Sequence, residues 1–255
     1  MRGLLVPALA AALLALPAAA RACAWPSPPR ILPGAPGAFI LAWTAPAAPL
    51  LADAPSRPPA LTAYRDWARA RTDVDPRSLL RRQLELYRRI GVVDGRMKLE
   101  LVLSGGIGRI LPMNCAEALL FAEHEARFPV ETTATEFLAF ILEKNADLKV
   151  YLISRGGKAG TAPSGDEVKE DLARDAAEGW TMAATLHNHP FMFDNPTGDI
   201  GGVLVPSGDA RYGDVGAFKR WRAGSGMRSA WITNGFDSLR LDGRDIDALA
   251  GLQRP

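Results

Sequence analysis

Residues 136–154 read EFLAFILEKNADLKVYLIS and residues 180–190 read WTMAATLHNHP, and these two stretches carry the clearest signals of the fold. The first holds two apolar runs separated by the polar segment KNAD, which is the pattern of two strands joined by a turn. The second is a short apolar run that ends on two histidines and a proline, as a buried strand does. Between them we expect a glycine-rich loop over residues 156–165 and a helix over residues 167–178. Strands and helices therefore alternate in this region.

The alternation continues towards the end of the chain. Val215, Phe218 and Trp221 have helical spacing, and Asn234-Gly235 between two apolar runs is a strong β-hairpin signal. Alternating strands and helices build an α/β fold. We therefore expect residues 130–250 to form a mixed sheet of about five strands flanked by helices.

Upstream, residues 61–129 are predicted to form an N-terminal helical section. Two polar-faced helices are expected over residues 62–71 and 75–89. Asp75 followed by Pro76 is typical of a helix start, because Asp is a good N-cap and Pro suits the first helical position.

Two further elements complete this section. Residues 97–104 (MKLELVLS) alternate apolar and charged side chains, and we expect them to form a half-buried strand ended by glycines. Asn114, with Glu117 three residues later, has the spacing of a capping box. It predicts the start of an apolar helix that Pro129 closes.

The N-terminal part of the chain has a different composition. Arg2, a short apolar run and small residues near position 22 are typical of a secretory signal peptide, which we assign to residues 1–22. The apolar run falls short of the roughly 18 residues that a membrane span needs, and no later segment qualifies. Twelve of the 20 prolines lie in the first 60 residues, so residues 23–60 are expected to be a Pro/Ala-rich linker or surface arm. Residues 39–43 within it are apolar enough to form a short docking strand.

Charge and cysteine content narrow the class of protein. The formal net charge of +2 falls to 0 once residues 1–22 are removed, so we expect no nucleic-acid partner. Export to the periplasm or the medium would permit a disulfide between Cys23 and Cys115, although two unrelated thiols fit the sequence equally well. Cleavage after Ala22 would leave Cys23 as the first residue, so a lipid anchor there is an alternative, which Arg21 disfavours.

His187 and His189 are the residues best placed to carry chemistry. Side chains at positions i and i+2 of a strand share one face, so both imidazoles can meet a single ion. Two neutral imidazoles suit zinc, and a catalytic zinc needs one more protein ligand and an open position for water. A carboxylate is the expected third ligand. Asp209 and Asp214, which follow Ser207, are the candidates.

Three features of the sequence form a pattern. They are Glu136 before an apolar strand, HNHP (residues 187–190) at the end of a later strand, and Pro206-Ser207 followed by acids. This pattern resembles the JAB1/MPN/Mov34 (JAMM) metalloprotease family, and in particular its bacterial RadC-like branch. The resemblance covers about residues 130–242. It implies a cytidine-deaminase-like α/β fold and zinc-dependent cleavage of a peptide or isopeptide bond in a protein or peptide substrate.

The resemblance also implies roles for individual residues. His187 and His189 would be zinc ligands, and Glu136 would be the general base and acid that moves the proton of the attacking water. Ser207 would support the developing oxyanion, as preorganised donors do in amide hydrolysis.

Two departures from the family pattern affect these roles. The family places the second His closer to the Ser than the 18 residues found here, and the extra segment at residues 191–205 is expected to form a flap over the site. The family's Asp is the third residue after the Ser, so Asp209 is one residue too close and Asp214 is four too far. We favour Asp214, because Val215 and Phe218 follow it with the apolar spacing of the family. Both acids also fit an ordinary role at a helix N-terminus.

The remaining candidates rank lower. His124, between two glutamates, is expected on the solvated side of its helix, and Glu131 is second to Glu136 as the base. The predicted function is a secreted zinc metallohydrolase. The alternative is a JAMM-like domain with impaired catalysis that acts as a zinc-binding or structural interaction module, which the stretched spacing motivates.

Overall fold

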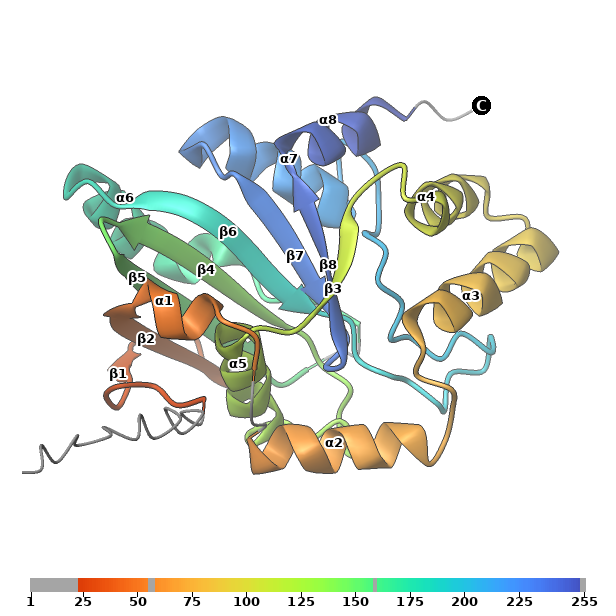
Figure 1. Cartoon of the computed structure of the whole chain (residues 1–255), viewed down its shortest axis with the longest axis horizontal. Helices are drawn as coiled ribbons and strands as arrows, with labels where there is room; N and C mark the ends of the chain where they lie inside the picture. Colours follow the sequence, from red (N-terminus) through yellow and green to blue (C-terminus); the bar gives the residue numbers. More distant parts are fainter. Residues whose placement is uncertain (1–22, 55–57, 158–159, 253–255) are drawn as a thin grey trace, which may run out of the picture.

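The computed structural model describes residues 23–54, 58–157 and 160–252, and the predicted signal peptide lies outside this part of the chain. Across these ranges the chain forms one eight-stranded mixed sheet and eight α-helices (Figure 1). The strands are β1 Arg30–Leu32, β2 Ala38–Pro46, β3 Arg109–Pro112, β4 Phe137–Lys144, β5 Asp147–Arg155, β6 Thr181–Asn188, β7 Ser229–Thr233 and β8 Asp237–Asp242. The helices are α1 Ala47–Leu51, α2 Pro59–Arg69, α3 Pro76–Ile90, α4 Val93–Ser104, α5 Cys115–Glu125, α6 Lys169–Ala177, α7 Gly213–Ser225 and α8 Gly243–Gly251, and a short 3-10 helix precedes α6 at Gly165–Val168.

The strands lie in the order β1-β2-β5-β4-β6-β7-β8-β3. Neighbouring strands are antiparallel except β6 and β7, which run parallel. A parallel pair requires a long crossover, and residues 189–228, which contain α7, provide it. The crossover begins at His189, directly after His187 and Asn188 at the end of β6. The conformation of the crossover therefore determines which side chains face the two histidines.

Side chains of the central strands alternate between two covered faces of the sheet. On β4, the odd-numbered residues from Phe137 to Ile141 share a buried cluster with residues of α1, α2 and α5. The even-numbered residues from Leu138 to Leu142 share a second cluster with residues of α3, α4, α7 and α8. Burial on both faces explains why the sequence of this strand is apolar without interruption.

The sheet is wider than the expected five strands, and the N-terminal part supplies the difference. β2 pairs with β5 along its whole length, and Ile40, Leu41 and Trp43 are buried. The expected docking strand is therefore confirmed, but residues 38–46 belong to the sheet and are not a linker. Their buried apolar side chains alternate between the two faces of the sheet. This burial favours pairing with β5 over an exposed position on the surface.

The prediction of a strand over residues 97–104 is wrong, because these residues form the last two thirds of α4. Leu99 and Val102 are buried with the three-residue spacing of a helix face. Gly105 adopts φ 73°, the left-handed conformation that ends many helices. The glycines that suggested the end of a strand instead cap a helix.

Local end signals elsewhere are confirmed. The Asp75 side chain accepts a hydrogen bond from the backbone of Ser78 at the start of α3, and Asn114 and Glu117 form a capping box at the start of α5. β7 and β8 form the hairpin predicted around Asn234-Gly235.

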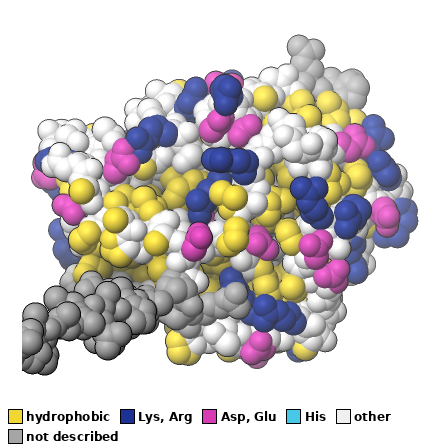
Figure 2. Space-filling view, in the orientation of Figure 1, with side chains coloured by type: hydrophobic (Ala, Val, Ile, Leu, Met, Phe, Trp, Pro, Cys, Tyr) yellow, Lys and Arg dark blue, Asp and Glu magenta, His cyan; other side chains and the backbone are white. Residues whose placement is uncertain are grey.

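A disulfide joins Cys23 to Cys115, with 5.3 Å between the two Cα atoms. It ties the start of the described chain to the start of α5. The sulfur of Cys23 is held in this bond, whereas the alternative of a lipid anchor would need the same sulfur as a thioether. None of the described helices combines the length and apolar character needed to cross a bilayer. On the face drawn in Figure 2, basic and acidic side chains are interspersed.

Candidate metal centre

His187 and His189 lie at the end of β6 with their rings directed to one point. Their Nε2 atoms are 3.1 Å apart, and His187 is almost fully buried. The Nδ1 atom of His189 lies 2.8 Å from the carbonyl oxygen of Val203. Because a carbonyl only accepts, Nδ1 must carry the proton of the neutral ring, which leaves the Nε2 lone pair directed at the common point. This second contact orients the ring as outer partners of metal ligands do.

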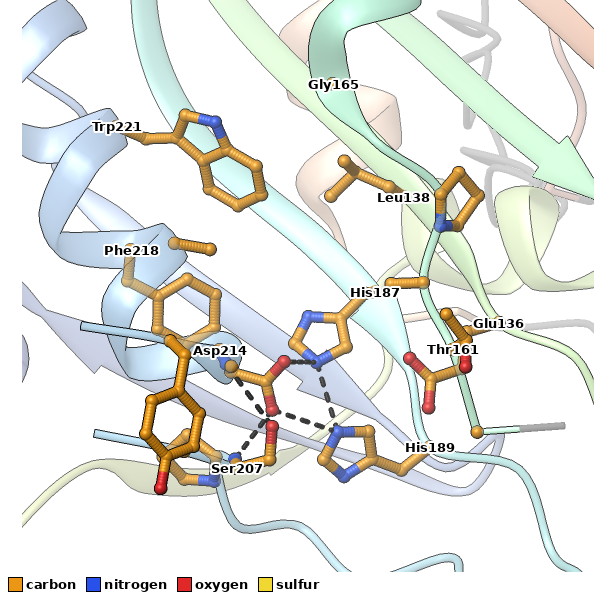
Figure 3. Close-up of a pocket in the computed structure, with 18 of the residues that line it drawn as sticks. Glu136, Leu138, Thr161, Gly165, His187, His189, Ser207, Asp214, Phe218 and Trp221 are labelled. Atoms are coloured by element: carbon orange, nitrogen blue, oxygen red, sulfur yellow. Dashed lines mark hydrogen bonds and ion pairs between the residues drawn. The ribbon is translucent and has the colours of Figure 1, made fainter. Parts of the chain in front are cut away.

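Asp214 in the first turn of α7 completes the group. Its two carboxylate oxygens lie 3.3 Å from His187 Nε2 and 3.3 Å from His189 Nε2 (Figure 3). One ligand atom from each of the three residues lies within 4.8 Å of the others. Tetrahedral zinc with ligands at about 2.0–2.1 Å holds its ligand atoms roughly 3.3 Å apart. The donor types and the spacing of these three side chains therefore fit zinc.

The charges in the group reinforce one another. Burial disfavours the imidazolium of His189, but the hydrogen bond and negative charge of Asp214 outweigh it and raise the pKa of His189 to about 9. Burial alone would raise the pKa of Asp214, yet the facing His187 and His189 hold it well below its ordinary value. The surroundings therefore keep Asp214 ionised and favour positive charge at the point that its carboxylate and the two imidazoles face.

A tight loop explains how Asp214 reaches the histidines from a position so far along the chain. The backbone N–H of Ser207 donates to Asp214 Oδ2 at 2.7 Å, and the backbone N–H of Asp214 lies 3.3 Å from Ser207 Oγ. Gly208 and Gly213, both with positive φ, pack against each other at the neck of this loop, where a Cβ on either would approach the other's backbone to within 3 Å. The loop holds Ser207 beside Asp214 despite their separation of seven residues.

Asp209 lies outside the metal-competent group. Its carboxylate accepts a hydrogen bond from the backbone of Arg211 at 2.8 Å and forms an ion pair with the Arg211 side chain at 3.2 Å. Asp209 thus belongs to the loop between Ser207 and α7, whereas Asp214 belongs to the centre.

Glu136 faces the same point from the start of β4. The register pairs Leu138 with His187, so continuing it by two residues brings Glu136 level with His189. In Figure 3 the carboxylate of Glu136 lies beside the rings of His187 and His189, without a hydrogen bond from the carboxylate to either ring. Burial raises the pKa of the Glu136 carboxyl, and the charges of His189 and His187 offset part of this rise.

Asn188, between the two histidines, holds the backbone around Glu136. Its Oδ1 atom accepts from the backbone N–H of Phe137 at 2.7 Å, and its amide nitrogen lies 3.3 Å from the carbonyl oxygen of Thr135. This positioning role was not predicted. The signal was available, because a polar residue on the opposite face of a buried strand needs a hydrogen-bond partner.

His124 is buried, with 1% of its surface exposed, so its predicted place on a solvated helix face is wrong. Its Nδ1 atom lies 3.0 Å from Ser154 Oγ and its Nε2 atom 3.1 Å from the carbonyl oxygen of Thr135. Burial lowers its pKa to about 4. His124 therefore supports Thr135, next to Glu136, from the other face of the sheet.

The two ends of the segment at residues 191–205 pack into the fold, and residues 194 and 196–198 between them are exposed. Phe191, Ile200 and Val203 are buried, and Asp199 Oδ2 accepts from Gln83 of α3 at 2.9 Å. Six of its residues line the pocket beside the candidate metal centre: Met192, Asp199, Gly201, Gly202, Val203 and Val205.

Lys98 of α4, which no local sequence signal marks, holds the next part of the same loop. Its ammonium group donates to the carbonyl oxygens of Pro206 at 2.8 Å and Gly208 at 2.7 Å. These two carbonyls flank Ser207. A helix of the N-terminal section thus holds the segment that positions the carboxylate of Asp214.

The centre opens into a pocket of about 1590 Å³. Glu136, Ser207 and the three metal-competent side chains line it, together with residues of α3, α4, α6 and α7. Comparisons with protein-family models, curated proteins and solved structures find no match to this chain. The geometry of the centre is therefore what indicates function.

Proposed function

We propose that this chain is a zinc-dependent hydrolase that cleaves a peptide or isopeptide amide bond. The observation that carries the proposal is the convergence of His187, His189 and Asp214 on one point, with Glu136 facing that point across the pocket. Three protein ligands leave a position open on zinc, as catalytic sites do and closed structural sites do not. The resemblance of the sequence to JAMM metalloproteases supports the same reaction class.

Each side chain has a role in this proposal. When bound, zinc supplies a Lewis acid that activates water and polarises an amide carbonyl at neutral pH. A carboxylate oxygen of Glu136 accepts the proton of the attacking water and then delivers it to the leaving nitrogen. The hydroxyl of Ser207 donates to the carbonyl oxygen as negative charge develops there. Asp214 and the two imidazoles hold the ion, while Asn188 keeps Glu136 at its position.

We also place the protein outside the cytoplasm. The disulfide between Cys23 and Cys115 supports this location, because such bonds persist in oxidising compartments and are rare in the cytosol. The predicted signal peptide at residues 1–22 provides the route of export.

Two pairs of variants test the proposal on the purified chain. Zinc content is measured by elemental analysis for Asp214→Asn and for Asp209→Asn, which changes the neighbouring acid outside the centre. Cleavage of a peptide library is followed by mass spectrometry for Glu136→Gln and for Glu131→Gln, a control on an exposed residue.

We expect one zinc per chain, retained in Asp209→Asn and weakened at least tenfold in Asp214→Asn. We expect chelator-sensitive cleavage that falls by roughly 100-fold or more in Glu136→Gln and persists in Glu131→Gln. Absence of stoichiometric zinc, or full cleavage by Glu136→Gln, would overturn the proposal. Tight zinc binding without cleavage would favour the non-catalytic interaction module.

A further inference from the structure

The pocket around the metal centre is larger than a small-molecule site and continues on both sides of the centre. Its volume of about 1590 Å³ exceeds the roughly 300–1,000 Å³ of sites that enclose small ligands. One arm runs between α6 and α7, and the other reaches the turn between α3 and α4. Figure 1 places α6 and the α3–α4 pair at opposite ends of the molecule, with the end of β6 between them.

The arm between α6 and α7 has an apolar floor that begins at the metal centre. Leu138, the register partner of His187, starts the floor, and Phe140 and Leu142 continue it along the same face of β4. Four residues of strand span about 13 Å. Figure 3 shows Leu138 and Trp221 on the opposite side of His187 from Ser207, in the direction of this arm.

Small residues on the two facing helices keep this arm open. Ala173 and Ala176 of α6 line one wall, and Ala217 and Gly224 of α7 line the other. A leucine at any of these positions would project into the space between the helices. Trp180, with Trp221 of α7, adds large apolar surface to the same arm.

The floor of this arm can contact the side chains of a bound chain but cannot pair with its backbone. β4 is paired with β5 on one edge and β6 on the other, so it offers no free edge to an added strand. A chain lying on it would bury apolar side chains against the floor, which is a favourable interaction that scales with the area buried.

The second arm has a different character. Its lining is mixed, with the polar or charged Gln83, Asp94, Lys98 and Asp199 beside Tyr87, Val92 and Val93. A mixed lining of this kind suits a polypeptide, which carries polar groups along its whole length, better than a purely apolar chain.

We infer that the substrate is an extended polypeptide cleaved at an internal bond, with apolar side chains bound between α6 and α7 on one side of the scissile amide. The other side of the chain continues past the centre towards the turn between α3 and α4. This inference rests on the proposed amide hydrolysis and adds to it the mode of cleavage and the preferred sequence.

Binding to a non-cleaving variant tests the apolar arm. Two fluorescein-labelled decapeptides, both acetylated and amidated at their ends, are titrated into zinc-loaded Glu136→Gln protein and followed by anisotropy. One carries a central run of Leu, Val and Phe, and the other carries Ser and Thr in its place. The same titrations are made with Ala173→Leu or Ala176→Leu added, and with Ala177→Leu as the matched control. Ala177 is an exposed neighbour on α6 that does not line the pocket.

We expect the apolar peptide to bind at least tenfold more tightly than the polar one. Ala173→Leu and Ala176→Leu should each raise its Kd at least tenfold, and Ala177→Leu should leave it within twofold. We expect all three leucine variants to fold, because Ala173, Ala176 and Ala177 are exposed, and circular dichroism and thermal unfolding check this. Equal binding of the two peptides, or an unchanged Kd in both arm-filling variants, would refute the apolar arm.

Product analysis with the parent protein tests the internal cut. The end-blocked apolar peptide should yield two fragments from an internal bond, and cleavage restricted to peptides with a free end would refute this mode. Failure of the proposed function has a different signature, since it appears as missing zinc or missing hydrolysis while the binding contrast between the two peptides remains.

Discussion

Replacing Lys98 with methionine tests whether the N-terminal helices hold the candidate metal centre in place. Lys98 is 5% exposed, and its ammonium group donates to the carbonyl oxygens of Pro206 and Gly208. Methionine keeps the length and much of the apolar volume of the lysine stem but cannot donate. The carbonyls on either side of Ser207 therefore lose this donor.

The expected loss of stability follows from these contacts. A hydrogen bond to a charged group contributes about 1.5–3 kcal/mol, so two of them contribute roughly 3–6 kcal/mol. Removing a buried ammonium group also removes the cost of its desolvation, which offsets part of the loss. We expect Lys98→Met to lower the free energy of unfolding by about 3 kcal/mol, a large share of the total stability of an ordinary domain.

The effect on metal affinity is the more specific consequence. The backbone N–H of Ser207 donates to Asp214 Oδ2, so a looser segment around Ser207 releases the carboxylate from its position. Loss of an outer partner of a metal ligand costs about 10–100-fold in affinity. We expect a weakening of zinc binding in this range.

Urea unfolding gives the stability change, and competition with a fluorescent chelator gives the zinc affinity. Lys219→Met on the exposed side of α7 is the matched control and should change neither quantity. The reasoning fails if Lys98→Met unfolds at the same urea concentration as the parent and binds zinc equally well. A stability loss without any change in zinc affinity would show that Lys98 supports the fold but not the centre.

Three further predictions concern the rest of the fold. The disulfide between Cys23 and Cys115 closes a separation of 92 residues, so its reduction should lower the free energy of unfolding by about 4–5 kcal/mol, measured by urea unfolding with and without reductant. Burial lowers the pKa of His124 to about 4 from an unfolded value near 6.5, so the unfolded chain binds the proton first and stability should fall by about 3 kcal/mol as the pH drops from 6.5 to 4. His124→Gln should show less of this pH-dependent loss in urea titrations at pH 7 and 4.5, and an unchanged slope would contradict the assignment. Gly202 has φ 67° and a Cβ there would lie 2.3 Å from the ring of Phe191, so Gly202→Ala should destabilise the chain by about 2–4 kcal/mol in the same assay, and a neutral result would exclude strain at this turn.

Local signals predicted those parts of the fold that depend on a few neighbouring residues. The capping residues Asp75 and Asn114 and the Asn234-Gly235 turn act within one turn of chain, so their roles are visible in the sequence. The strand predicted over residues 97–104 failed, because eight residues with charges at alternate positions fit both periods. Its buried Lys98 finds its acceptors more than 100 residues away, and no local pattern reports such a partner.

The candidate site divides in the same way. The two-residue period of a strand predicted that His187 and His189 share a face. The apolar spacing after Asp214, which matches the resembled family, favoured Asp214 over Asp209, and Asp214 is the acid that lies beside them. The burial of His124 could not be predicted from its glutamate neighbours. Every turn of α5 is buried, and the partners that make this tolerable, such as Ser154, come from other elements.

The long separation between His189 and Ser207 has a structural cause that bears on the choice between a working and an impaired centre. After β6 the chain runs outward to α3, where Asp199 accepts from Gln83, and then to α4, where Lys98 holds it, before it returns to α7. The extra length is therefore the distance needed to reach the N-terminal helices and come back. The N-terminal part of the chain also supplies β1 and β2 at one end of the sheet and β3 at the other, so the section upstream of residue 130 and the section that carries the centre share one sheet. Because Asp214 still meets both imidazoles after this detour, the stretched spacing gives no reason by itself to expect an impaired centre, and zinc binding and cleavage become the measurements that decide.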